Sequence, residues 1–96
     1  MEPVYITAVL KAKQGNEQRL YEALLKVASP SRDEAGCQEY RLHQSAEDSS
    51  VFVLYEIWQN EEALQSHINS PHYGEYRNSI EPLVEKREVY RLGRIS

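Results

Sequence analysis

The order of the predicted elements is that of an α+β domain of the ferredoxin-like, split-βαβ type, with helices on one face of a four-stranded antiparallel sheet. Three observations predict this fold class. Apolar residues alternate, as they do in strands, over residues 3–13, 37–45, 51–59 and 84–95. They recur at helical spacing between the first two and between the last two of these segments. The length of 96 residues favours one domain, residues 1–96.

The first strand carries apolar residues on both faces, so both faces are expected to be covered at least in part. One face holds Val4, Ile6, Ala8 and Leu10, and the other holds Tyr5, Thr7, Val9 and Lys11. Asn16 is a suitable N-cap for the helix that follows, and Glu17 lies where the helix dipole favours a negative charge. Because Pro30 disfavours the helical conformation at Ser29, that helix is expected to end or kink there, with room for one more turn over residues 31–34 before Gly36.

The third strand, residues 51–59, is the strongest in the chain. Alternation places Val51, Val53, Tyr55 and Ile57 on one face, and Phe52, Leu54, Glu56 and Trp58 on the other. Asn60 is expected to cap the next helix. Ser70 followed by Pro71 predicts a second helix start, so the second helical region is divided into two short helices.

Composition and charge argue against several classes of protein. The net charge is −4, and the basic residues near the C-terminus alternate as on a solvated strand face, so nucleic-acid binding is not expected. The apolar runs are too short to span a bilayer. Glu2 and Pro3 interrupt any signal-peptide pattern, and the single cysteine, Cys37, can form no intrachain disulfide. We therefore expect a cytoplasmic protein.

The face of the sheet opposite the helices is expected to be apolar. Exposed apolar patches of that size are rare on monomers. We therefore expect a homodimer in which two sheets pack face to face and enclose a barrel-like core.

The helix-covered face of the sheet carries the most informative polar residue, Glu56, beside Trp58. A carboxylate on such a face is costly unless it is paired or solvated by a pocket. Arg32 or Arg77 would make a structural salt bridge with it. His67 would instead make an acid–base couple.

Structural interpretations exist for each of these side chains. Trp58 is equally suited to the core, and a histidine such as His67 on an apolar helix face is often a satisfied core residue. His72 is expected to face water, and Tyr73 to pack inward. Since His67 and His72 are five residues apart with Pro71 between them, the spacing predicts no metal site. No cofactor fingerprint is present either.

Several short segments, taken in order and spacing, together resemble one known family. They are Lys13–Glu17, Glu34–Cys37, Phe52–Trp58, Glu62–His67 and Ser70–Tyr73. The family is that of the antibiotic biosynthesis monooxygenase domain, whose members are small dimeric α+β barrel proteins. It includes cofactor-independent oxygenases that act on phenols and quinols, with heme-degrading enzymes and an isomerase of a phosphorylated sugar among its relatives.

The resemblance implies a cofactor-independent monooxygenase that acts on a small quinol- or phenol-type substrate. His67 would be the base, assisted by Glu56, beside aromatic and apolar walls formed by Phe52, Leu54, Trp58 and Tyr73. Heme-degrading relatives carry their axial histidine near the position of Arg77, so no heme is implied here.

Two alternatives remain open from the sequence. The same pocket would suit an isomerase of a small carbonyl compound, for which Arg32 or Arg77 would hold a phosphate. The chain would otherwise be a non-catalytic dimeric binding module whose interior is filled by Phe52, Leu54 and Trp58.

Overall fold

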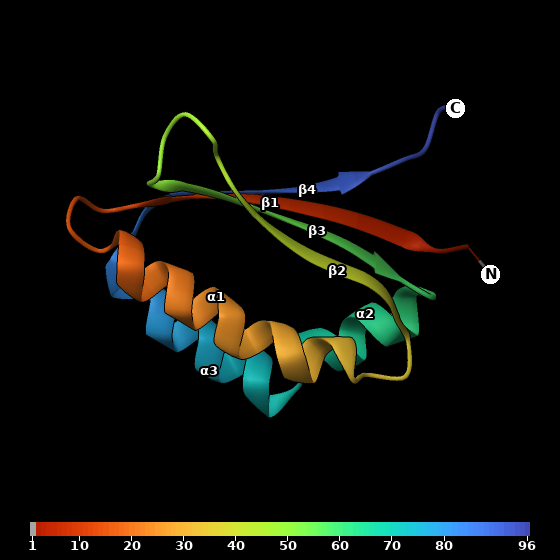
Figure 1. Cartoon of the computed structure of the whole chain (residues 1–96). Coiled ribbons are helices and arrows are strands. Elements are labelled where there is room, and N and C mark those ends of the chain that lie inside the picture. The colour runs from red at the N-terminus through yellow and green to blue at the C-terminus, as the bar shows by residue number, and fades with distance from the viewer. Residues whose placement is uncertain (1) are drawn as a thin grey trace.

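The computed structural model describes residues 2–96 and has the predicted order of elements (Figure 1). They are β1 (Val4–Ala12), α1 (Glu17–Arg32), β2 (Cys37–Gln44), β3 (Val51–Trp58), α2 (Glu61–Ile68), α3 (Pro71–Ile80), a 3₁₀ turn (Glu81–Leu83) and β4 (Val84–Leu92). Within residues 2–96, no helix is long and apolar enough to cross a membrane. The last strand ends at Leu92, three residues before its predicted end.

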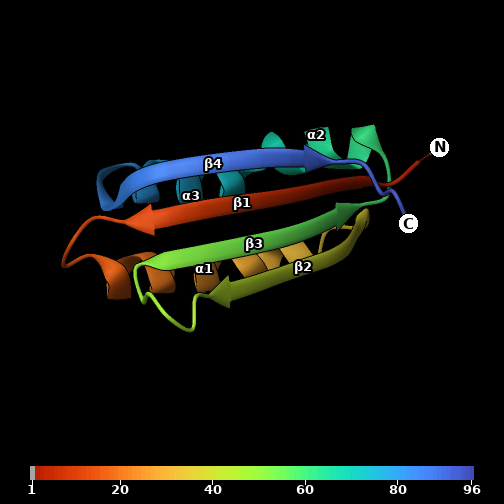
Figure 2. The same ribbon diagram turned by 90° about the horizontal axis from the view of Figure 1, so that it is seen from above.

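The four strands form one antiparallel sheet in the order β2-β3-β1-β4 (Figure 2). All three helices lie on one face of this sheet, and the other face is uncovered (Figure 1). The predicted fold class is therefore confirmed. In the register of the two central strands, Ile6 lies opposite Glu56 and Ala8 opposite Leu54. On the other side of β1, Leu10 lies opposite Arg87 of β4.

The core lies between the sheet and the helices, and the predicted alternation of the two central strands is confirmed. In both strands every second residue is buried, and the residues between them are half-buried. The apolar core also takes side chains from all three helices and β2: Leu20, Leu24, Val27, Ala28, Tyr40, Leu64, Tyr76 and Ile80. The polar side chains buried with them are Ser31, Glu56 and His67.

Helix α1 continues past the point at which it was expected to end or kink. It runs through Pro30 to Arg32, so the helix does not end at Ser29, and the further turn expected before Gly36 is part of it. Proline deletes one helical hydrogen bond, but the buried inner face of α1 holds this last turn against the sheet. The Ser31 hydroxyl adds a bond of 2.6 Å to the carbonyl of Val27. Asn16 occupies the N-cap position without a side-chain bond.

The predicted caps of α2 and α3 are both present. The Asn60 side chain accepts a bond of 2.9 Å from the Ala63 N–H. The Ser70 hydroxyl accepts a bond of 3.2 Å from the Tyr73 N–H and donates one of 2.6 Å to the carbonyl of His67. Ser70 thereby ties the end of α2 to the start of α3, which fixes the side chains on both sides of the junction.

Gly36 is required where the α1–β2 connection passes α2. A Cβ at Gly36 would lie 2.3 Å from the Cβ of Ala63, closer than two non-bonded carbon atoms can approach. Gly36→Ala is therefore expected to lower the free energy of unfolding by about 1–3 kcal/mol, the usual cost of overpacking. Denaturant titration measures this change.

The matched control is Gly74→Ala, in the exposed part of α3, where a new Cβ meets no atom within 4 Å. There alanine is expected to stabilise the helix, by at most about 1 kcal/mol. Equal effects of the two variants would show that Gly36 is not under steric constraint.

Candidate functional site

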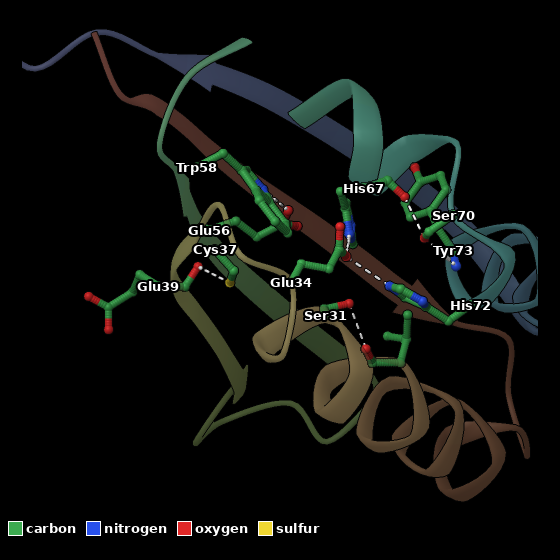
Figure 3. A network of polar contacts seen from close by, with 11 residues as sticks. Ser31, Glu34, Cys37, Glu39, Glu56, Trp58, His67, Ser70, His72 and Tyr73 are labelled. Atoms are coloured by element: carbon green, nitrogen blue, oxygen red, sulfur yellow. Dashed lines mark hydrogen bonds and ion pairs between the residues drawn. The ribbon is translucent and has the colours of Figure 1, made fainter. Parts of the chain in front are cut away.

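A single carboxylate oxygen joins two histidines at one end of the helical layer (Figure 3). Oε2 of Glu34 lies 2.7 Å from Nδ1 of His67 and 2.8 Å from Nε2 of His72. Because an ionised carboxylate can only accept hydrogen bonds, each of the two ring nitrogens donates its own proton to this oxygen. Sequence reasoning placed Glu34 only in a family segment and missed its role.

Three separate segments bring these side chains together. Glu34 lies in the α1–β2 connection, where its backbone N–H bonds to the carbonyl of Ser31 and its own carbonyl accepts from Cys37. His67 belongs to the last turn of α2, and His72 to the first turn of α3. The three residues enclose the junction that Ser70 caps (Figure 3).

The structure corrects two expectations for His72. Its side chain is only 24% exposed and bonds to Glu34, so the prediction that it faces water was wrong. The five-residue spacing from His67 was expected to keep the two rings apart. That rule holds within one helix, but here the chain turns between α2 and α3 and brings both rings to Glu34.

His67 is held as an oriented, neutral imidazole. It is 1% exposed, and its ring stacks on the indole of Trp58 with centroids 4.3 Å apart. Burial lowers the pKa of His67, against the hydrogen bond and charge of Glu34, which raise it. Nδ1 donates to Glu34, whereas Nε2 has no hydrogen-bond partner among the described residues. The free lone pair on Nε2 makes His67 a candidate base.

Glu56 does not pair with His67 as expected. Its Oε1 accepts a bond of 2.9 Å from Nε1 of Trp58, and His67 bonds to Glu34 instead. The physical reason is the indole, which contacts both groups: its ring face stacks on His67 while its N–H satisfies Glu56. Burial raises the pKa of Glu56, against the Trp58 hydrogen bond and the Arg87 charge, which lower it.

A cavity of about 90 Å³ lies between the sheet and the helices α2 and α3. His67 and Glu56 both line it. The other lining residues are Ile6, Ala8, Tyr40, Leu54, Leu64, Ile68, Tyr73, Tyr76, Arg87 and Val89. Ile68 and Val89 are exposed, so they mark the mouth of the cavity between α2 and β4.

Arg87 is a second residue that sequence reasoning missed. The basic residues of the last strand were expected on a solvated face, but Arg87 lies opposite Leu10, is half-buried and points into the helix-covered layer. Its Nη2 lies 3.4 Å from the Tyr73 hydroxyl, and its Nε is buried with no hydrogen-bond partner within residues 2–96. This guanidinium therefore offers a donor to an oxygen atom of a ligand in the cavity.

The remaining predicted residues divide into two groups. Leu54 and Tyr73 line the cavity, as expected of wall residues. Phe52 instead lines a separate hollow between α1 and β2. Arg32 donates from Nε to a backbone carbonyl of β2 at 2.9 Å. Arg77 is exposed on α3 and does not line the cavity.

Burial of Glu56 predicts a pH-dependent cost to stability. An acid whose pKa is raised in the folded state destabilises that state as pH rises through the raised pKa, because the folded protein must then bury the charge. Glu56→Gln keeps an acceptor for Trp58 and removes this cost. Its melting temperature is expected to exceed that of the parent at pH 8, and the gain is expected to shrink towards pH 4.

Thermal unfolding at several pH values checks this expectation. Glu62→Gln, at an exposed position on α2, is the control and should show no such gain. A gain for Glu56→Gln that does not change with pH would contradict the argument from burial.

Comparison with known proteins agrees with this architecture. The family model described as "Antibiotic biosynthesis monooxygenase" matches residues 3–79. "Putative monooxygenase Rv0793" of Mycobacterium tuberculosis is 33% identical over 84 residues, which are 88% of this chain and 82% of that protein. The uncharacterized protein sll1783 of Synechocystis is 23% identical over 99% of this chain, which spans only 65% of that protein's length.

Solved structures are similar over the whole domain. The crystal structure of PA3566 from Pseudomonas aeruginosa has a TM-score of 0.94 and 32% identity, covering 100% of this chain and 97% of that one. The structure of Rv0793 has a TM-score of 0.93 and 30% identity, covering 99% and 97%.

Proposed function

Because this chain belongs to the antibiotic biosynthesis monooxygenase family, we propose that it is a cofactor-independent monooxygenase that acts on a small phenol- or quinol-type substrate. One observation carries the proposal. His67 lines the cavity with an Nε2 that no other described residue bonds, while Glu34 fixes the opposite nitrogen. A base held in this way suits the removal of a proton from a substrate hydroxyl.

The proposed reaction begins with proton transfer from the substrate hydroxyl to Nε2 of His67. Glu34 stabilises the imidazolium that forms, because its carboxylate already accepts the Nδ1 proton. Arg87 and the Tyr73 hydroxyl hold the substrate oxyanion. Glu56, fixed by Trp58, lies on the same cavity and assists at a second hydroxyl of the substrate.

The electron-rich anion then reacts with molecular oxygen. A quinol and one O₂ give a hydroxyquinone and one water, so one oxygen atom enters the ring and the other leaves as water. All four electrons come from the substrate, and the reaction needs no external reductant. The protein contributes the base, the orientation and a site from which water is excluded.

The volume of the cavity also supports a second candidate. Ligand pockets commonly measure about 300–1,000 Å³, and the cavity of about 90 Å³ must widen at its mouth to admit a bicyclic quinol. A small carbonyl compound needs less space. Isomerisation by the same base, with Arg87 on the carbonyl oxygen, is therefore the alternative.

The protein is further expected to act as a homodimer through the uncovered face of the sheet. Val51, Val53, Tyr55 and Ile57 are half-buried there without any covering layer, and Tyr90 and Leu92 of β4 are exposed. Figure 1 shows that no helix lies over this face. A second sheet packed against it would bury these side chains.

Oxygen uptake in the presence of a reduced naphthoquinol tests the oxygenase. With oxygen-18 gas, one labelled atom is expected in each product molecule. The rate of oxygen uptake is expected to exceed that of the same reaction without protein. Turnover that is unchanged when oxygen is removed would overturn the monooxygenase and favour the isomerase. A rate no higher than the protein-free reaction across a series of quinols and phenols would also overturn the oxygenase, leaving the isomerase and the binding module.

A further inference from the structure

The cluster of Glu34, His67 and His72 has a second chemical capacity besides orienting a base. Oε2 of Glu34, Nδ1 of His67 and Nε2 of His72 all lie within 4.8 Å of one another. Two imidazole nitrogens and one carboxylate oxygen form the ligand set of catalytic zinc sites and of non-heme iron sites, in both of which further positions stay open. The three residues therefore match transition-metal chemistry in type as well as in number.

The geometry needs little adjustment to hold an ion. Metal–ligand distances of roughly 2.0–2.2 Å place the ligand atoms of a tetrahedral site about 3.3 Å apart. The nitrogens now lie 2.7 and 2.8 Å from the same oxygen, so each of these two separations must open by about 0.5 Å. The two nitrogens, which lie within 4.8 Å of each other, must settle at the same spacing of about 3.3 Å. The Ser70 cap holds the two helix ends in place while the side chains move.

An ion can reach the cluster from solvent. The side chains of His72 and Glu34 are 24% and 17% exposed. His72 also lines a surface groove between α1 and α3, in which Glu75 is paired with Lys26 at 2.7 Å. His67, at 2% side-chain exposure, closes the inner side of the cluster. The cluster therefore has one side open to solvent and one side buried. An ion that keeps some of its water ligands needs such an open side.

We propose that Glu34, His67 and His72 bind one divalent transition-metal ion, for which Zn²⁺ is the probe. The ion replaces the two hydrogen bonds to Glu34. With the ion on Nδ1, the neutral ring of His67 carries its single proton on Nε2.

The metal-bound form has a consequence for catalysis that rests on the proposed function. With its proton on Nε2, His67 has no lone pair left for a substrate hydroxyl. The base-competent form and the metal-bound form of His67 therefore exclude each other, and an ion at this site inhibits turnover. The binding of the ion itself does not depend on what the cavity accepts.

Calorimetric titration of the chelator-treated protein with ZnCl₂ tests the site, with the absorption spectrum of bound Co²⁺ as a second readout. One ion per chain is expected. His72→Ala and Glu34→Gln should each weaken binding more than about tenfold. His43→Ala removes the exposed histidine on β2, outside the cluster, and should bind as the parent does. Circular dichroism confirms that each variant is folded.

The outcomes separate the two proposals. Absence of Zn²⁺ binding, equal binding by parent and His72→Ala, or equal losses in His72→Ala and His43→Ala would overturn the metal site. That result would leave the proposed function intact, because quinol turnover is measured on the metal-free protein. Binding that is lost only in the cluster variants, together with no turnover in any form, would support the metal site and remove the proposed function.

Discussion

Replacing His67 with glutamine is expected to lower the turnover of an active quinol by about 10²–10⁴-fold, the usual contribution of a positioned general base. Glutamine keeps a donor for Glu34 and much of the volume against Trp58, so the fold should survive. Steady-state kinetics with the metal-free protein measures the effect, which should fall mainly on kcat. Circular dichroism and the melting temperature show whether the variant is folded.

Glu34 provides the sharper half of this prediction. Glu34→Gln offers an amide in place of the carboxylate that fixes the Nδ1 proton, so His67 loses its oriented tautomer. Turnover should fall by a similar factor, and the double variant should be no worse than either single one, because the two residues act as a unit. His43→Gln, at the exposed histidine, is the control. If the fold losses of turnover in the two single variants multiply in the double variant, Glu34 and His67 do not act as a unit.

Placing a lysine at Val53 is expected to have the largest effect on assembly. Val53 lies on the uncovered face, opposite Val9 in the centre of the sheet. A buried, unpaired ammonium costs several kcal/mol, and a two-fold interface would contain two of them. We expect the dissociation constant of the dimer to rise more than about 100-fold, at a cost of at least about 2.7 kcal/mol.

Sedimentation over a range of concentrations measures this change. Leu25→Lys is the control, because Leu25 is 51% exposed on α1, on the opposite side of the molecule. It should leave assembly unchanged. A parent protein that is monomeric at micromolar concentration would contradict the predicted dimer. An equal effect of both lysines would contradict the sheet face as its interface.

The fold was predictable because each element carries its own local signal. Alternation in β1 and β3 states which side chains share a face, and the structure confirms both sets. Ser70 followed by Pro71 marks the start of α3 by capping chemistry alone. The end of α1 was not predictable in this way, because burial of its inner face outweighs the local preference against Pro30.

The candidate site could be predicted only in part, because its contacts join segments far apart in the chain. His67 and Trp58 were identified from the faces they occupy, and both are buried at the site. Glu34 lies in a connection without periodicity, 33 residues from His67, so no local pattern indicates that the two meet. Arg87 lies in a strand whose charged residues are mostly exposed, so the sequence pattern does not distinguish it from them. Only its place opposite Leu10 in the sheet puts it under the helices.

The stacking of Trp58 on His67 also makes the site observable by light. Trp58 is the only tryptophan in the chain, so the indole emission comes from one place. Its ring face lies 4.3 Å from the imidazole, centroid to centroid, and its N–H bonds to Glu56. A charge gained by that imidazole, or a ligand that displaces it, alters the environment of the excited indole. The unlabelled protein therefore contains its own fluorescent reporter of events at His67.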